Sequence, residues 1–266
     1  MPEIVDADAY IARLLAAPRP GGENLLAFYE HRLGVIGTDP RLLLIPLDDH
    51  LVHRGDGVFE TLKYVDGRLY QVAPHFERME RSAAAIHLAP PCSWDEAAEL
   101  TLAVCRAGGA DTGMVRVIVG RGPGGFGIDP AECPVPSLTI VAYRFHPRPA
   151  EAFTKGVTAF RTSIPAKQNY LARIKSIDYL PNVLMKREAT MRGEDYLRSA
   201  TTTRDFWPRA RPRTSAWWTR RAVSWCRNST TLFAAPPSCG RWSFLAANGR
   251  WSSRRCARKP SPRPGR

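Results

Sequence analysis

The sequence lacks the features that would place it in a membrane or among disulfide-stabilised proteins. It contains no run of about 18 apolar residues, the length that a membrane-spanning helix needs. Its beginning has no basic region followed by an apolar run, which a secretory signal peptide would require. The six cysteines show no paired spacing, so we interpret them as reduced thiols. We therefore expect a soluble, cytoplasmic protein without a membrane partner.

Metal-ligand spacing is absent from the sequence as well. His50 and His53 lie three residues apart, but no cluster of carboxylates or cysteines accompanies them at the spacing of a zinc site. We expect no metal in the functional site.

Acidic residues almost disappear from the last part of the chain. Residues 1–196 carry 22 Lys and Arg against 24 Asp and Glu, whereas residues 197–266 carry 16 against 1. The last segment also holds six of the seven tryptophans, but no Glu, Ile, Tyr, Met, Gln or His. This composition is unlike that of a globular segment. The net charge of +13 therefore describes the tail and not the rest of the chain.

A turn, a hairpin and a helix are predicted between residues 48 and 86. Residues 58–65 are rich in strand-forming residues, and Asp66-Gly67 is a two-residue hairpin signal before a return strand at 68–72. Pro74 opens a helix over 75–86, from whose first turns Arg78 projects. The other expected elements are strands at 42–46, 114–119, 138–143 and 156–163, and helices at 94–107 and 181–191.

Lys175 begins the stretch Lys-Ser-Ile-Asp-Tyr-Leu-Pro-Asn, just before the last of these helices. A lysine amine is useful as a nucleophile when burial or a neighbouring charge lowers its pKa, most often for Schiff-base formation with an aldehyde cofactor. The alternative is a solvated surface lysine, because lysines are rarely buried.

Taken together, residues from Ile45 to about Tyr196 resemble the class IV aminotransferases, which are fold-type IV pyridoxal-phosphate enzymes. The motifs that carry the resemblance are His-Arg-Gly-x-Gly-Val-Phe at 53–59, Gly-Pro-Gly at 122–124 and Lys-Ser-x-x-Tyr-Leu-Pro-Asn at 175–182. Within the family, the likeness is greatest to D-amino-acid aminotransferases and aminodeoxychorismate lyases.

The resemblance implies roles for three residues. Lys175 is expected to hold pyridoxal 5′-phosphate as an aldimine and to move the proton between substrate and cofactor. Arg78 is expected to bind the cofactor's phosphate, for which a planar fork of donors is suited. Its alternative role is a surface ion pair with Glu77, Glu80 or Glu188. Tyr179 is expected near the cofactor's 3′ oxygen.

Gly120, Gly122 and Gly125 satisfy the pattern Gly-x-Gly-x-x-Gly after a predicted strand. The next expected element is another strand and not a helix, so this is not a dinucleotide-binding fingerprint. The resemblance makes the segment a loop at the rim of the active site, where Arg121 is a candidate for binding a substrate carboxylate. A plain glycine-rich connection is the alternative.

Two interpretations of residues 197–266 remain open. Basic residues interleaved with aromatics could form a nucleic-acid-binding arm, or the segment could be a GC-rich gene read out of register. With synonymous codons and a shifted frame, residues 204–219 can be read as a stretch containing Glu-Gly-Pro-Thr-Glu, and 232–237 as one containing Gly-Thr-Thr. Both resemble motifs of the family's second domain. We prefer the frameshift, which argues against a nucleic-acid partner and predicts a disordered tail.

We expect an α/β (α+β) protein with the two-domain architecture of fold-type IV. Residues 1–147 would form a small N-terminal α/β domain, 148–196 would begin the C-terminal domain that carries the lysine, and 197–266 would leave that β-barrel-like domain incomplete. By resemblance the protein is a homodimer.

The expected function is pyridoxal-phosphate-dependent transfer of an amino group between an amino acid, of D or branched-chain type, and a 2-oxo acid. One alternative is an aminodeoxychorismate lyase of 4-aminobenzoate and folate synthesis. A second alternative is a non-catalytic pseudoenzyme or a nucleic-acid binder that uses the basic tail. Pro208 and Arg209 stand where the family has the glutamate that faces the pyridine nitrogen, so we expect this chain to be impaired.

Overall fold

In the computed structural model the chain forms two compact units. Unit 1 comprises Met1–Gly156 and Lys167–Val183, and unit 2 comprises Val157–Ala166 and Leu184–Arg266. The structure describes residues 1–147, 149–150, 159–160, 162, 164–165, 167, 170–193, 196–197, 217–219 and 222–224.

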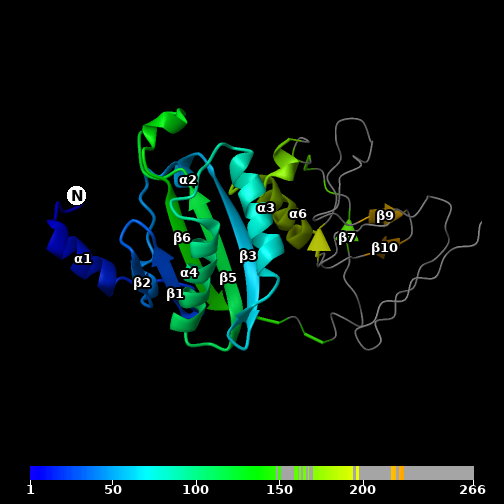
Figure 1. Cartoon of the computed structure of the whole chain (residues 1–266), viewed down its shortest axis with the longest axis horizontal. Helices are drawn as coiled ribbons and strands as arrows, with labels where there is room; N and C mark the ends of the chain where they lie inside the picture. Colours follow the sequence, from blue (N-terminus) through cyan, green and yellow to red (C-terminus); the bar gives the residue numbers. More distant parts are fainter. Residues whose placement is uncertain are drawn as a thin grey trace, which may run out of the picture. The chain divides into compact units, whose positions relative to one another are not determined.

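A six-stranded sheet forms the centre of unit 1 (Figure 1). Its strand order is β2-β1-β6-β5-β3-β4, and every pairing in it is antiparallel. The strands are β1 (Leu25–Glu30), β2 (Val35–Gly37), β3 (Gly57–Val65), β4 (Arg68–Leu69), β5 (Thr112–Gly120) and β6 (Ser137–Arg144).

The turn between β3 and β4 sets the register of the hairpin. Asp66 and Gly67 have φ values of 49° and 67°, as a two-residue type I′ turn requires. Tyr64 therefore pairs with Leu69, and Val65 with Arg68. The hairpin predicted from Asp66-Gly67 is confirmed.

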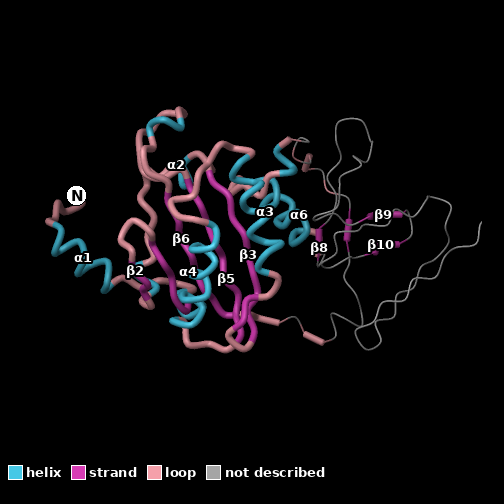
Figure 2. The backbone as a smooth tube through the Cα atoms, in the orientation of Figure 1, coloured by secondary structure: helices cyan, strands magenta, loops and turns pink. Residues whose placement is uncertain are grey.

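Helices α3 (Val72–Ala84) and α4 (Trp94–Ala107) cover one face of the sheet (Figure 2). The first buries Phe76, Met79 and Ala83, which recur every three to four residues along one side of the helix. The second begins at Ser93, whose hydroxyl accepts a hydrogen bond from the backbone N–H of Glu96 at 3.1 Å. Its bounds agree with the predicted helix over 94–107.

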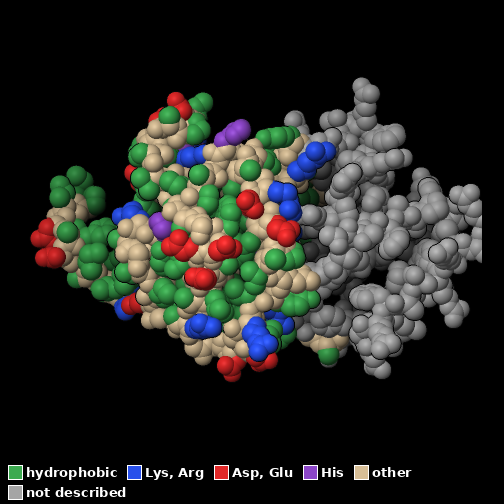
Figure 3. Space-filling model, in the orientation of Figure 1, with side chains coloured by type: hydrophobic (Ala, Val, Ile, Leu, Met, Phe, Trp, Pro, Cys, Tyr) green, Lys and Arg blue, Asp and Glu red, His purple; other side chains and the backbone are tan. Residues whose placement is uncertain are grey.

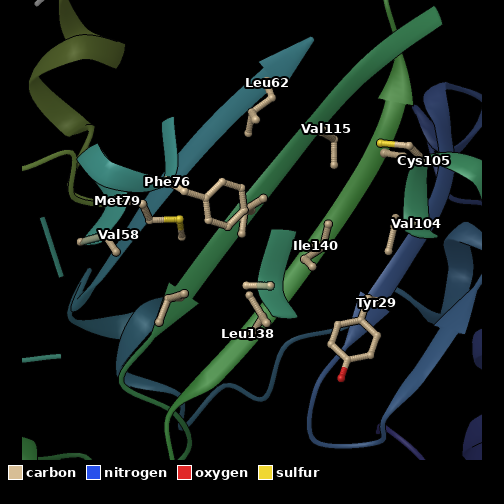
Figure 4. Close-up of a cluster of buried hydrophobic side chains, with 14 of the residues drawn as sticks. Tyr29, Val58, Leu62, Phe76, Met79, Val104, Cys105, Val115, Leu138 and Ile140 are labelled. Atoms are coloured by element: carbon tan, nitrogen blue, oxygen red, sulfur yellow. The ribbon is translucent and has the colours of Figure 1, made fainter. Parts of the chain in front are cut away.

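The buried core of unit 1 lies between this face and the two helices (Figure 4). Leu62 from β3, Val115 from β5 and Ile140 from β6 meet Met79 from α3 and Val104 from α4, all at 0% exposure. Full burial of such a side chain contributes roughly 1.5–3 kcal/mol. The core therefore fixes which way each residue of β3 points, and Glu60 points toward α3.

The remaining described elements are shorter or lie outside the central sheet. They are α1 (Ala7–Ala16), α2 (His50–His53) and α6 (Leu180–Met191), the 3-10 helices Gly22–Asn24, Pro40–Leu42, Pro130–Glu132 and Leu171–Arg173, the parallel pair β7 (Ala159–Phe160) and β8 (Tyr196–Leu197), and the antiparallel pair β9 (Trp217–Thr219) and β10 (Ala222–Ser224). None of the helices in the described part of the chain is long and apolar enough to cross a membrane.

Three expectations about the elements need correction. The strand predicted at 42–46 is wrong, because Asp39 caps a 3-10 helix over Pro40–Leu42 and no strand follows before residue 57. The return strand ends at Leu69 instead of 72, since Gln71 adopts a left-handed conformation with φ 53° and α3 starts directly after it. Of the strand predicted at 156–163, the structure describes Ala159–Phe160, and the remainder lies largely outside the described residues.

Three further elements, α1, β1 and β2, were not predicted from the sequence. β1 reads as a continuous apolar run, which periodicity alone does not assign to a strand or a helix. The loop after β5 leads to β6 through one 3-10 helix. The expectation that a strand, and not an α-helix, follows Gly120, Gly122 and Gly125 is confirmed.

Candidate active site

Lys175 lies on an extended segment that pairs with the edge of β3 opposite β5. Ser176 forms an antiparallel bridge with Val58. The backbone N–H of Phe59 donates to the carbonyl of Lys175 at 3.1 Å, and the N–H of Ile177 donates to the carbonyl of Gly57 at 2.9 Å. The lysine segment, which the sequence analysis placed in a domain beginning at 148, thus packs with unit 1.

A third backbone contact holds Lys175 from the helix side. Its N–H donates to the hydroxyl of Ser82 on α3 at 3.2 Å. The same hydroxyl donates to the carbonyl of Arg78 at 2.8 Å. Through these two hydrogen bonds, the buried Ser82 links the backbone of Lys175 to that of Arg78.

The amine of Lys175 lies against two aromatic side chains. Its Nζ atom lies 4.0 Å from the centroid of the Phe59 ring and donates a hydrogen bond to the hydroxyl of Tyr179 at 3.1 Å. The rings of Phe59 and Tyr179 meet edge to face, with centroids 5.0 Å apart. A cation is attracted to the face of an aromatic ring. The structure therefore brings Lys175 and Tyr179 together, and Lys175 is not a solvated surface lysine.

Arg78 turns inward and pairs with Glu60, whose side chain is 0% exposed. Nε of Arg78 donates to one carboxylate oxygen and Nη2 donates to the other. His75 adds a contact from Nδ1 to Oε2 at 2.8 Å. The predicted alternative for Arg78 was a surface ion pair with Glu77, Glu80 or Glu188. The described ion pair of Arg78 is instead the one with Glu60, and Glu77 lies 3.9 Å from Arg81.

Two opposing effects set the pKa of Glu60. Burial raises it, whereas hydrogen bonds from Arg78 and His75 and the charges of Arg78 and Lys175 lower it. The lowering effects prevail, so the pKa of Glu60 lies below its ordinary value of 4.5. In turn, the hydrogen bond to Glu60 raises the pKa of Arg78. The site therefore contains a buried carboxylate that stays ionised.

Two further cations, neither of them predicted from the sequence, lie near these aromatic rings. Cζ of Arg116, an exposed residue of β5, lies 5.2 Å from the Phe59 centroid. Nζ of Lys167 lies 5.5 Å from the Tyr179 centroid and 3.6 Å from Oδ2 of Asp178. The strand alternation of β5 could have indicated that Arg116 faces away from the core. No sequence signal pointed to Lys167.

Arg121 belongs to a different set of contacts. Nε and Nη2 donate to the two carboxylate oxygens of Asp56 at 2.8 and 3.0 Å. Nη1 donates to the carbonyl of His87, and Nη2 to that of Ile86, both at 2.9 Å. Arg121 has no hydrogen bond or ion pair to Lys175, Arg78 or Tyr179 in the described residues. A substrate carboxylate would have to compete with Asp56 for this guanidinium, and its binding by Arg121 stays a prediction.

The loop after Arg121 depends on a glycine. Gly122 has a φ of 98°, and a Cβ atom there would lie 1.8 Å from the carbonyl oxygen of Val135. Its N–H donates to the carboxylate of Asp49, which is 0% exposed.

Within the described ranges no group of three or more His, Cys, Asp or Glu side chains could hold a metal ion.

Residues 57–200 match the family model described as amino-transferase class IV. The chain is 35% identical over 175 residues to a chloroplastic D-amino-acid transaminase of Arabidopsis thaliana, covering 65% of this chain and 46% of that protein. It is 32% identical over 166 residues to a bifunctional aminodeoxychorismate lyase / D-amino acid transaminase of Mycobacterium tuberculosis, covering 58% and 54%. The chain thus spans about half the length of the curated relatives it matches.

Solved structures show the same fold. A branched-chain amino acid aminotransferase from Escherichia coli aligns with a TM-score of 0.59 at 22% identity, over 65% of this chain and 59% of that one. The enzyme of the same name from Thermoproteus uzoniensis aligns with a TM-score of 0.56 at 21% identity, over 65% and 59%. The fold expected from the motifs, that of fold-type IV aminotransferases, is therefore confirmed, and the chain belongs to the class IV aminotransferase family.

Proposed function

We propose that this protein uses pyridoxal 5′-phosphate to move an amino group between an amino acid and a 2-oxo acid, with Lys175 as the residue that binds the cofactor. The observation that carries the proposal is the position of the Lys175 amine. It contacts Phe59 and Tyr179, and its backbone is joined to that of Arg78 through Ser82. Lys175, the candidate for covalent catalysis, and Arg78, the candidate for phosphate binding, are thus linked through the hydroxyl of Ser82.

The residues present fit this cofactor. Glu60 accepts from Nε and Nη2 of Arg78, and no described residue accepts from Nη1. A guanidinium carries five N–H donors in a planar fork, so Arg78 keeps donors for a phosphate. The amine of Lys175 would hold the aldehyde carbon, and Tyr179 would lie beside it. When bound, the pyridine ring supplies an acceptor for the electrons released at the substrate's Cα.

Lys175 would also carry the proton in the reaction. Once its amine is released, Nζ can accept the proton from Cα of the substrate and return it at the other reacting carbon. Such a base has to lie within hydrogen-bonding reach of the proton it moves. The hydrogen bond from Nζ to Tyr179 and the contact with Phe59 restrict the rotamers of the lysine and so direct its amine.

Two arginines, Arg116 and Arg121, are candidates for binding the carboxylate of a substrate. Arg116 is exposed beside Phe59, which also contacts the Lys175 amine. Arg121 could take part only if its contact with Asp56 opened. Amino acids and 2-oxo acids both have a carboxylate next to the reacting carbon. Arg116 is therefore the better placed of the two for such a group.

Chemical trapping tests the role of Lys175. The chain would be mixed with pyridoxal 5′-phosphate, reduced with borohydride and digested, and the labelled peptide identified by mass spectrometry. We expect the label on Lys175 and its loss in Lys175→Ala. Lys167→Ala is the matched control, since Lys167 also lies beside Tyr179, and it should retain the label. A label that persists in Lys175→Ala at the original yield would contradict the proposal.

An aminodeoxychorismate lyase is the second candidate, favoured by the name of the Mycobacterium tuberculosis relative. The two activities share the lysine and the cofactor but differ in their need for a second substrate. With aminodeoxychorismate, release of pyruvate without any amino acceptor would establish the lyase. Turnover of D- or branched-chain amino acids only in the presence of a 2-oxo acid would establish the transaminase.

We further propose that the chain as written is impaired, because residues 197–266 would leave its cofactor domain incomplete. The family match ends at residue 200. The positions of Pro208 and Arg209, where a glutamate is expected, lie outside the described residues, and the sequence contains no glutamate after Glu194. A homodimer in the cytoplasm is also part of the proposal, and sedimentation analysis would test the oligomeric state. Normal turnover by the chain as written would contradict the proposed impairment.

A further inference from the structure

The described part of the chain buries two carboxylates completely, those of Asp49 and Glu60. Asp49 accepts hydrogen bonds from neutral donors, the backbone N–H groups of Leu51 and Gly122 and the hydroxyl of Ser137. Glu60 accepts from the cationic Arg78 and from His75. A buried charge is costly unless it is paired and hydrogen-bonded. The pairing explains how Glu60 is tolerated but does not explain what the pair is for.

Glu60 occupies one edge of the Arg78 guanidinium and leaves its end free for another ligand. The carboxylate binds the side of Arg78 formed by Nε and Nη2. Nη2 has a further contact of 3.4 Å with Nδ1 of His75. Both N–H groups of Nη1, at the end of the fork, have no partner among the described residues. The Arg78 side chain is 25% exposed, whereas that of Glu60 is 0% exposed. The accessible donors of the pair therefore belong to Arg78.

We propose that Glu60 is a positioning residue, which holds Arg78 by one edge so that the end of its guanidinium is oriented toward the phosphate of the cofactor. This inference rests on the proposed function. An arginine side chain has many rotamers, and restricting them before binding leaves less freedom to lose when the phosphate binds. His75 restricts the carboxylate in turn through its contact with Oε2. Glu60 itself would not touch the cofactor.

If only charge mattered, removal of Glu60 would strengthen phosphate binding and not weaken it. Glu60 offsets the positive charge of Arg78, so its removal should increase the attraction of a phosphate if the guanidinium stayed where it is. Orientation and charge therefore make opposite predictions for a neutral substitution. Glu60→Gln separates them, because the amide keeps the shape of the side chain but presents an NH2 group where one arginine N–H now donates.

The test compares two aldehydes that differ in the phosphate. The dissociation constants of pyridoxal 5′-phosphate and 5′-deoxypyridoxal would be measured from the absorbance of the lysine adduct. We expect Glu60→Gln to weaken binding of the phosphate compound about tenfold, the loss of one oriented charge-assisted contact. Binding of 5′-deoxypyridoxal should stay unchanged. Arg78→Ala should reduce the preference for the phosphate compound at least as much.

Asp49→Asn is the matched control. It also neutralises a fully buried carboxylate in unit 1, and it should lower thermal stability without changing the preference between the two aldehydes. If Glu60→Gln does not fold, His75→Ala replaces it, because it loosens Glu60 without unpairing Arg78. We expect a smaller loss with the same selectivity for the phosphate compound.

The possible outcomes separate this inference from the proposed function. Equal weakening of both aldehydes in Glu60→Gln would show a general structural role and overturn the positioning role alone. Tighter binding of the phosphate compound would show that Glu60 competes for Arg78, which also overturns it. If the wild-type chain forms no lysine adduct with either aldehyde, the proposed function fails and the inference fails with it.

Discussion

At the scale of single residues, Ser82 contacts two residues of the candidate site, Lys175 and Arg78, through one hydroxyl. Its hydroxyl accepts from the N–H of Lys175 and donates to the carbonyl of Arg78. Ser82→Ala would leave the part-buried N–H of Lys175 without this partner, which costs about 1 kcal/mol. We expect a loss of that size in urea unfolding, together with weaker formation of the cofactor adduct.

Ser93→Ala is the control for this change. Ser93 caps α4 on the surface, and its loss should cost about 1 kcal/mol without any effect on the adduct. If both variants formed the adduct as the wild type does, Ser82 would have no part in placing the lysine.

The thiol of Cys105 should be inert in the folded protein. Burial raises its pKa to about 12, and the thiolate is the reactive form. We expect iodoacetamide at pH 8 to leave Cys105 unmodified until a denaturant is added, as read by peptide mass spectrometry. Rapid labelling under native conditions would show that α4 opens locally or that the residue is less enclosed.

Acid should remove the contribution of Glu60 to stability. Its pKa in the folded state lies below the ordinary value of 4.5, so the folded state favours the ionised form. The contribution is complete above the unfolded-state pKa and is lost as the pH falls through the folded-state pKa. The difference in free energy of unfolding between wild type and Glu60→Gln should therefore stay constant above about pH 5 and shrink below it. A difference that is unchanged at pH 3 would exclude this ion pair as its source.

At the scale of elements, local signals predicted some parts of the fold well. The hairpin at Asp66-Gly67, the helix over 94–107 and the strands now seen as β5 and β6 have clear turns, caps or alternation. β1 and β2 lack such signals, and their assignment depends on pairing with β6 and with each other. Long-range pairing is not visible in a local pattern.

The same distinction applies to the candidate site. The motifs located Lys175, Arg78 and Tyr179, and the structure places the first and last of these in contact. Glu60 and Ser82 were not found, because their importance comes from contacts between β3, α3 and the lysine segment. Glu60 lies 18 residues from Arg78 in the sequence, and Ser82 lies 93 from Lys175. Only the packing of the elements reveals these contacts.

Two glycines with positive φ should respond differently to the same substitution. At Gly67, φ is 67° and a Cβ atom would meet nothing within 4 Å, so Gly67→Ala should cost about 1 kcal/mol of backbone strain. At Gly122 a Cβ atom would also collide with the carbonyl oxygen of Val135. We expect a clearly larger loss for Gly122→Ala in thermal unfolding. Equal losses would mean that the loop after β5 adjusts without cost.

At the scale of the whole molecule, the charge distribution separates the family-like part of the chain from its tail. Residues 1–196 carry 22 basic and 24 acidic residues, and both signs occur on the described face shown in Figure 3. Residues 197–266 carry 16 and 1, and they lie almost entirely beyond the family match. The sequence predicted this division, whereas most of the tail lies outside the described residues.

The frame of the tail can be tested directly. Resequencing the DNA that encodes residues 193–207 should reveal a single-base error, and correcting it should restore a Glu-Gly motif. We expect the corrected chain to bind pyridoxal 5′-phosphate more tightly than the chain as written and to gain transaminase or lyase turnover. If the frame is confirmed, a basic arm remains. Its binding to nucleic acid should then fall steeply with salt and disappear on truncation after Tyr196.

The pairing of the lysine segment with β3 has a consequence for solubility. An exposed sheet edge presents unpaired N–H and carbonyl groups on which another chain can add a strand. The segment containing Lys175, Ser176 and Ile177 satisfies these groups along Gly57–Phe59. The backbone that delivers the reactive amine thus also closes the side of the sheet, and a chain shortened before this segment would expose a template for edge-to-edge aggregation.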